Sequence, residues 1–203
     1  MRELIVTTFV TLDGVMQAPG GPGEDDSGGF AHGGWSVPYW DELMGRVVAE
    51  ATSRPFAMVL GRRTYEIMAA YWPHASEEEG AKVFNDATKY VASRSRRTLE
   101  WSNSVLIEGD AAEGIARLKE GDGPELQVHG SGNLIQSLLA NELVDRFRLW
   151  TFPLVLGSGK RLFAEGTIPA ALTLVDSTVS TTGVVIGTYE PAGEVLTASF
   201  GSD

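Results

Sequence analysis

The stretch Val59-Leu60-Gly61-Arg62-Arg63-Thr64-Tyr65 joins the end of an apolar strand, through a glycine, to the start of a helix. Glycine lets a ligand approach the backbone closely. The first turn of a helix leaves several N–H groups free and carries a partial positive charge. Because two arginines and a threonine hydroxyl stand at the same place, the stretch predicts a binding site for an anionic group such as phosphate.

A second stretch of the same design follows later in the chain, Val128-His129-Gly130-Ser131-Gly132-Asn133-Leu134. It departs from the G-x-G-x-x-G dinucleotide fingerprint, because Ile135 stands where the third glycine belongs. Two ordinary turns that use glycine for their geometry are the alternative interpretation. If both turns lie in one sheet, they predict a grip on the two ends of a pyrophosphate.

Strands alternate with helices on both sides of these turns. We expect strands at residues 4–10, 56–60, 90–92, 104–107, 126–129 and 147–152. We expect helices at residues 39–52, 62–70, 81–87, 111–119 and 132–140. The last two strands, at residues 172–179 and 184–189, follow each other directly. This order predicts an α/β fold with a mixed, mostly parallel sheet and a C-terminal antiparallel hairpin.

Composition narrows the classes of protein. The 203 residues predict a single domain at 1–191 and a flexible tail at 192–203. The net charge of −11 argues against a nucleic-acid partner, although a local arginine cluster can still hold phosphate. The absence of cysteine excludes disulfides and thiolate chemistry, and three scattered histidines argue against a metal site. The apolar N-terminal run is too short to span a membrane, so we expect a cytoplasmic protein with no membrane partner.

A loop rich in glycine and proline, at residues 13–38, is predicted to fold over a cleft. Trp35 and Trp40 at its end could stack on a flat heterocycle, and packing in the core is the alternative. His32 has a suitable ordinary pKa for a general acid, and a solvent-exposed loop residue is the alternative.

Four stretches of this chain, taken together and in order, resemble the dihydrofolate reductase-like superfamily. Within it they look closest to the group related to the reductase domain of bacterial riboflavin biosynthesis, the RibD C-terminal group. The stretches are Thr11-Leu12-Asp13-Gly14, Gly61-Arg62-Arg63-Thr64-Tyr65-Glu66, Val128-His129-Gly130-Ser131-Gly132 and Pro153-Leu154-Val155-Leu156-Gly157-Ser158-Gly159-Lys160-Arg161-Leu162-Phe163.

The resemblance implies a dihydrofolate reductase-like, three-layer α/β/α fold and NADPH as the cofactor. It implies cofactor contacts at Thr7, Asp13, Gly14, Val15, Met16, Gly61, Arg62, Arg63, Thr64, Ser93, Arg94, Gly130, Ser131, Gly132, Asn133 and Leu134. Because arginine matches phosphate bidentately, Arg62, Arg63 and Arg94 favour NADPH over NADH.

The same resemblance implies reduction of a small heterocyclic or carbonyl/imine substrate, with activity like that of 5-amino-6-(5-phosphoribosylamino)uracil reductase or dihydrofolate reductase. Substrate contacts are expected at Trp35, Trp40, Pro153, Leu156 and Gly157.

Folate-reducing enzymes carry a carboxylate on their first helix. Here Trp40 stands close to that position and Asp41 beside it, which argues against folate. Water, Asp41 and His32 remain as alternative proton sources. A non-catalytic nucleotide-binding or flavin-binding protein is the alternative function. Because related reductase domains pair through their sheets, we also expect a homodimer through the apolar C-terminal hairpin.

Overall fold

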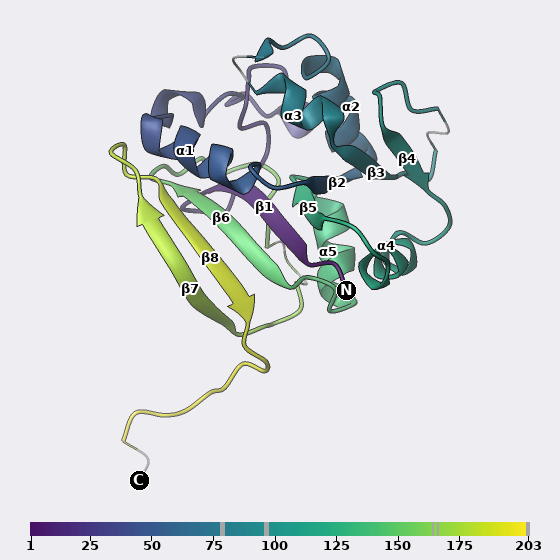
Figure 1. Cartoon of the computed structure of the whole chain (residues 1–203). Coiled ribbons are helices and arrows are strands. Elements are labelled where there is room, and N and C mark those ends of the chain that lie inside the picture. Colours follow the sequence, from purple (N-terminus) through teal and green to yellow (C-terminus); the bar gives the residue numbers. More distant parts are fainter. Residues whose placement is uncertain (78–79, 96–97, 164, 166, 202–203) are drawn as a thin grey trace.

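The computed structural model describes residues 1–77, 80–95, 98–163, 165 and 167–201. One eight-stranded sheet runs through it in the order β4-β3-β2-β5-β1-β6-β8-β7 (Figure 1). The strands are β1 (Leu4–Thr11), β2 (Phe56–Gly61), β3 (Thr88–Ala92), β4 (Ser104–Ile107), β5 (Glu125–His129), β6 (Arg146–Phe152), β7 (Leu172–Val179) and β8 (Val185–Pro191). Neighbours from β4 to β6 pair in parallel, and β8 pairs antiparallel with both β6 and β7. The predicted sheet is confirmed.

Helices cover both faces of the parallel part of the sheet (Figure 1). The helices are α1 (Glu42–Ala51), α2 (Arg62–Tyr71), α3 (Ala81–Asp86), α4 (Ala111–Glu120) and α5 (Gly132–Ala140). Met58 and Leu60 of β2 pack with Tyr65 of α2, whereas Val59 packs with Ile115 of α4 on the opposite face. The predicted three-layer α/β/α fold is therefore confirmed.

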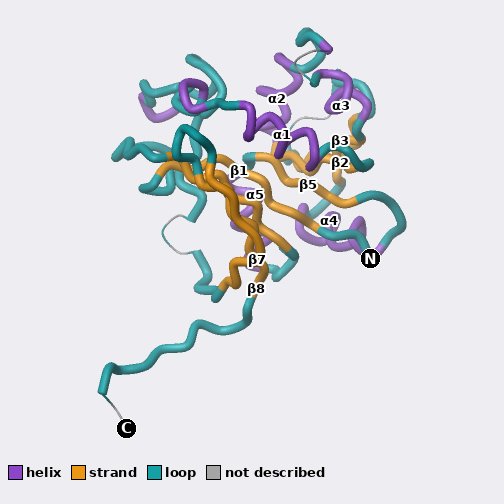
Figure 2. The backbone as a smooth tube through the Cα atoms, turned by 60° about the vertical axis from the view of Figure 1, so that its left-hand side comes forward, coloured by secondary structure: helices purple, strands orange, loops and turns teal. Residues whose placement is uncertain are grey.

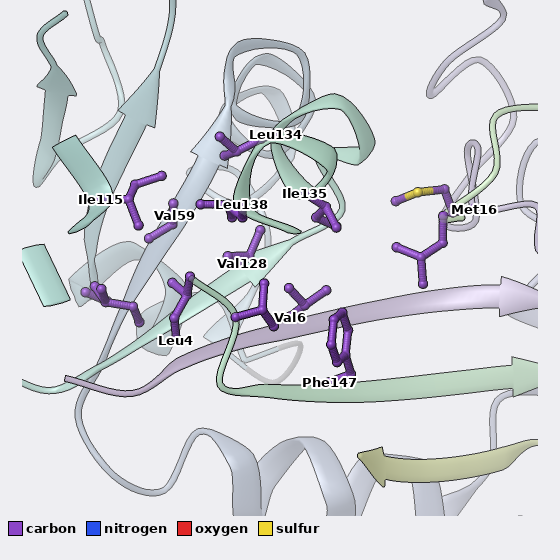
Figure 3. Close-up of a cluster of buried hydrophobic side chains, with 14 of the residues drawn as sticks. Leu4, Val6, Met16, Val59, Ile115, Val128, Leu134, Ile135, Leu138 and Phe147 are labelled. Atoms are coloured by element: carbon purple, nitrogen blue, oxygen red, sulfur yellow. The ribbon is translucent and has the colours of Figure 1, made fainter. Parts of the chain in front are cut away.

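Figure 3 shows the core between the sheet and helices α4 and α5. There Val59 and Val128 from the strands pack with Ile115 from α4 and Leu138 from α5. The residues of β2 from Phe56 to Leu60 are all buried, because a parallel strand is covered on both faces. This packing leaves the carboxyl ends of the strands, and the turns that follow them, as one edge of the fold.

The helix expected at residues 39–52 begins later, at Glu42. A separate 3₁₀ turn, Val37–Tyr39, precedes it. Between them Asp41 adopts an extended conformation, and its carboxylate accepts a 2.9 Å hydrogen bond from the Met44 N–H. The helical spacing of the apolar residues continued past this aspartate, but its preference for the N-cap position ends the regular helix there.

The glycine-rich loop at residues 13–38 is held by a buried polar hub. The Asp25 carboxylate accepts 2.6 Å hydrogen bonds from Lys160 Nζ and from Ser27 Oγ. The Gln17 amide donates to the Asp25 carbonyl, and the Trp35 indole N–H donates to the Gln17 carbonyl. Two segments far apart in the chain are thereby joined into one wall at the carboxyl edge of the sheet.

After β8 the chain leaves the sheet and extends outward up to residue 201 (Figures 1 and 2). Leu196 and Phe200 in this tail are fully exposed. Among the residues that the structure describes, no helix has the length and apolar character needed to cross a membrane.

Candidate functional site

A cleft of about 840 Å³ opens at the carboxyl ends of the parallel strands. Its walls come from the turns after β2, β3 and β5, the start of α4 and the loop at residues 13–38. Small-molecule sites in proteins usually occupy ~300–1,000 Å³, and in open α/β sheets they lie outside the carboxyl ends of the strands. The position and the size both mark this cleft as a ligand site.

The two glycine turns singled out in the sequence lie side by side in this cleft. The Gly61 N–H donates a 2.9 Å hydrogen bond to Ser131 Oγ, and that hydroxyl donates to the His129 carbonyl at 2.9 Å. Gly130 has a φ of 52° and lies against Thr64, so a side chain there would be both strained and crowded. The starts of α2 and α5 therefore face the same cleft.

The helices that begin at these turns lack side-chain caps. Neither α2 nor α5 has a capping hydrogen bond or an acidic residue in its first turn. By contrast, α1 and α4 are capped by the carboxylates of Asp41 and Asp110. Because the N–H groups at the start of α2 and α5 have no acceptor from a capping side chain, they suit an anionic group of a ligand.

The three arginines predicted to favour NADPH, Arg62, Arg63 and Arg94, line the cleft together with Arg161. Arg62 pairs with Glu66 at 3.1 Å, and Arg63 lies 3.4 Å from the Asp25 carboxylate. The two arginine side chains are about half exposed, and such ion pairs contribute only about 0–1 kcal/mol. Arg94 is exposed. These weak pairings leave the guanidinium groups able to exchange a carboxylate for a phosphate.

The structure brings most of the predicted cofactor residues into this cleft. Its lining includes Thr7, Met16, Gly61, Arg62, Arg63, Thr64, Ser93, Arg94, Gly130, Ser131, Gly132, Asn133 and Leu134. Asp13, Gly14 and Val15 are not part of the lining. Asp13 instead accepts hydrogen bonds from Thr11 Oγ1 and from the Gly157 N–H. These bonds, the Thr11 bond first, lower the pKa of Asp13 to about 2 and hold the segment 153–162 against the end of β1.

None of the residues predicted to contact the substrate or to donate a proton lines the cleft. These are His32, Trp35, Trp40, Asp41, Pro153, Leu156 and Gly157. Trp35 is buried edge-on against Phe152, and Trp40 stacks on Trp150 at 6.3 Å between ring centroids.

Asp41 has a structural position as well as its cap. Its second carboxylate oxygen accepts 2.7 Å hydrogen bonds from the N–H and the hydroxyl of Thr181 in the turn between β7 and β8. The bonds from Met44 and Thr181 lower its pKa. An ionised carboxylate tied to two elements outside the cleft does not fit the proton donor that was predicted.

The cleft also contains polar residues that were not among the predicted cofactor or substrate contacts. Gln17, Glu24 and Asp25 come from the glycine-rich loop, and Lys160 comes from the later segment. The Glu24 carboxylate accepts hydrogen bonds from the N–H groups of Gly20 and Gly21, and burial raises its pKa. Isolated polar residues in a glycine-rich loop carry no spacing signal, so only the folded chain reveals this group.

The floor of the cleft consists of sheet residues that point toward α1 and α2. It includes Thr7, Phe9 and His129. Burial, with a contribution from the positive charge of Arg148, lowers the pKa of His129 to about 4. The imidazole is therefore neutral near pH 7, with Nε2 at 3.2 Å from Gln127 Oε1. Within the described ranges, no group of three or more His, Asp or Glu side chains is arranged to hold a metal ion.

The sheet order and the cleft together define an α/β protein of dihydrofolate reductase-like fold. The RibD C-terminal domain family matches residues 2–186, and the chain belongs to this family.

Relatives and solved structures agree with this assignment. The chain is 29% identical to protein YyaP of Bacillus subtilis (strain 168), over 91% of this chain and 92% of YyaP. It is similar to the structure of a candidate riboflavin biosynthesis protein from Shewanella sp. PV-4, with a TM-score of 0.69, 22% identity, and coverage of 93% and 98% of the two chains. Dihydrofolate reductase from Enterococcus faecalis, in complex with NADP(H) and RAB-propyl, gives a TM-score of 0.59 at 14% identity, over 94% and 96%.

Proposed function

We propose that the protein binds NADPH in this cleft and uses it to reduce a small heterocyclic or carbonyl/imine substrate. The observation that carries the proposal is the pairing of two uncapped helix starts through Gly61 and Ser131. A pyrophosphate has two anionic groups a short distance apart, which matches two adjacent anion sites. The Enterococcus faecalis reductase of the same fold, which is in complex with NADP(H), supports the choice of cofactor.

The residues present fit this cofactor. The N–H groups at the starts of α2 and α5 would hold the pyrophosphate, and Arg62, Arg63 and Arg94 would bind the 2′-phosphate. NADPH, when bound, supplies the hydride, and the protein supplies position and electrostatics. Thr7 and Phe9 on the floor, with Met16 on the wall, would hold the reactive ring against the substrate.

Reduction also needs a proton, and Glu24 is the carboxyl group in the lining that fits this task. Asp25 is paired with Lys160, and Asp110 caps α4. Although burial acts to raise it, hydrogen bonds from Lys160 and Ser27 lower the pKa of Asp25 to about 2. The pKa of Glu24 is instead raised, so its carboxyl holds a proton at higher pH than an ordinary glutamate.

The test combines binding with turnover. NADPH is titrated into the purified protein, and its absorbance is then followed with a panel of pterins, pyrimidines and quinones. NADPH binding together with oxidation by at least one compound supports a reductase. Tight NADPH binding without turnover across the panel would favour a non-catalytic nucleotide-binding protein. A bound yellow chromophore in the purified protein would favour the flavin alternative.

A further inference from the structure

Three buried polar atoms without a hydrogen-bond partner lie on neighbouring strands beside the cleft. They are Thr7 Oγ1 on β1, and Arg148 Nη1 and Trp150 Nε1 on β6. Among the described residues the fourth such atom is Ser104 Oγ, on the edge strand β4. Buried polar groups in folded proteins almost always have a partner, so three orphans in one place require a cause.

The register of the sheet places these groups on one face. Thr7 pairs with Arg148 in the ladder between β1 and β6, and Phe9 pairs with Trp150. Residues two apart on a strand share a face, so the three groups form a continuous polar strip. Thr7 and Phe9 line the cleft, and on its other side Thr7 pairs with His129, which also lines it. The strip therefore extends the cleft floor across the sheet, from β5 and β1 to β6.

Arg148 differs from its neighbour on the same face. Arg146 pairs with Glu3 at 3.1 Å and with Glu190 at 2.6 Å. Within the part of the chain that the structure describes, no carboxylate lies within ion-pair distance of Arg148. A partly buried cation without a counter-charge is unfavourable, and a ligand that brings the missing acceptor removes the penalty.

We propose that Arg148, Thr7 and Trp150 form a substrate subsite that binds a carboxylate carried on a flat, unsaturated ring. This inference rests on the proposed function, since such a substrate would lie next to the reactive ring of the cofactor. A planar guanidinium binds both oxygens of a carboxylate, and the hydroxyl and the indole N–H add two donors.

The shape of the strip favours a flat ring over a tetrahedral phosphate. Phe9 lies 5.2 Å from Trp150 and 6.4 Å from Trp40 between ring centroids. Aromatic side chains at these spacings contact flat rings by stacking or edge-on packing. Because the three atoms are buried, the ligand would be admitted by a small rearrangement of these rings.

The experiment measures the binding of benzoate, benzamide and inorganic phosphate by calorimetry, with and without NADPH. Benzoate is expected to bind at least tenfold more tightly than benzamide. Arg148→Met is expected to weaken benzoate at least tenfold, and Thr7→Val and Trp150→Phe severalfold each. Ser104→Ala removes the remote orphan hydroxyl and is expected to leave benzoate binding unchanged.

Thermal unfolding shows whether a loss of benzoate binding is caused by misfolding of the variant. Arg148→Met removes an unpartnered donor, so its Tm is expected to equal or exceed that of the wild type. Benzoate is expected to raise the Tm of the wild type and not that of Arg148→Met. Benzoate affinity that does not depend on Arg148, or phosphate that competes as well as benzoate, would overturn the assignment.

The same samples separate this inference from the proposed function. NADPH affinity is measured in parallel on the wild type and on Arg148→Met, and it is expected to be equal in both. If benzoate binds through Arg148 and NADPH does not bind, the cofactor proposal is wrong and the subsite proposal stands. If NADPH binds and benzoate affinity does not depend on Arg148, the subsite proposal is wrong and the cofactor proposal stands.

Discussion

The Gly61 N–H donates a 2.9 Å hydrogen bond to the Ser131 hydroxyl, across a separation of 70 residues in the chain. This bond joins the turn after β2 to the turn after β5. It places two helix starts without side-chain caps in the wall of one cleft. The proposed NADPH site depends on this pairing more than on either turn alone.

Ser131→Ala removes the acceptor of the Gly61 N–H. We expect the free energy of unfolding to fall by about 1 kcal/mol, the usual net value of a hydrogen bond, and NADPH affinity to fall severalfold. Chemical denaturation and a binding titration measure the two effects. Ser102→Ala, at an exposed position before β4 and outside the cleft lining, is the control and should change neither. An unchanged NADPH affinity in Ser131→Ala would show that the link between the turns does not shape the site.

Glu24→Gln keeps an oxygen that can accept from the Gly20 and Gly21 N–H groups but cannot donate a carboxyl proton. We expect kcat to fall at least tenfold with any reduced substrate, and NADPH affinity to stay within twofold. In the wild type, kcat should decline as pH rises through the raised pKa of Glu24, and the variant should lack this limb. Asp26→Asn, a change at an exposed position in the same loop, is the control. The same pH profile in both variants would rule out Glu24 as the donor.

Asp25 is expected to make the free energy of unfolding decrease at acid pH. Its pKa in the folded protein is about 2, below the ordinary value of 3.8, so its contribution is fully present above pH 3.8 and is lost as pH falls through 2. A shift of this size corresponds to about 2 kcal/mol. We expect Asp25→Asn to lower stability at neutral pH and to flatten this acid limb. Denaturation curves across the range measure it, and parallel curves for both proteins would contradict the assignment.

The edge strand β7 is the surface that we propose for a homodimer. Leu174, Val175 and Val179 are each about half exposed on it, and an edge strand offers unpaired N–H and C=O groups to a second copy. We expect a dimer in sedimentation at micromolar concentration and a monomer for Val175→Lys combined with Val179→Lys. Val105→Lys on the opposite edge strand is the control and should stay dimeric. A monomeric wild type would reject this interface.

Much of the fold was predictable, because the sequence patterns that indicate strands and helices are local. The buried run Phe56–Gly61 and the helix periodicity of α4 and α5 depend on neighbours in the chain, so the sheet and the layers followed from them. The two glycine turns were found for the same reason. The start of α1 was misplaced because the apolar spacing ran past Asp41, whose capping role ends the helix.

The wall formed by the loop at residues 13–38 and Lys160 was not predictable in this way, because its contacts join distant segments. Gln17 Oε1 accepts from the Lys160 N–H across 143 residues, and Asp25 binds Lys160 across 135. Trp35 reads as a stacking residue in the sequence, yet its indole N–H finds the Gln17 carbonyl and the ring turns inward. The spacing of residues along the chain does not predict such long-range pairings.

The most direct test of the central claim compares NADPH and NADH binding to the wild type, Arg62→Ala and Arg63→Ala. Arg46→Ala on the exposed face of α1 serves as the control. We predict that the wild type binds NADPH at least tenfold more tightly than NADH, and that each rim variant loses NADPH affinity much more than NADH affinity. Equal losses for both nucleotides, or no binding of NADPH to the wild type, would contradict the account.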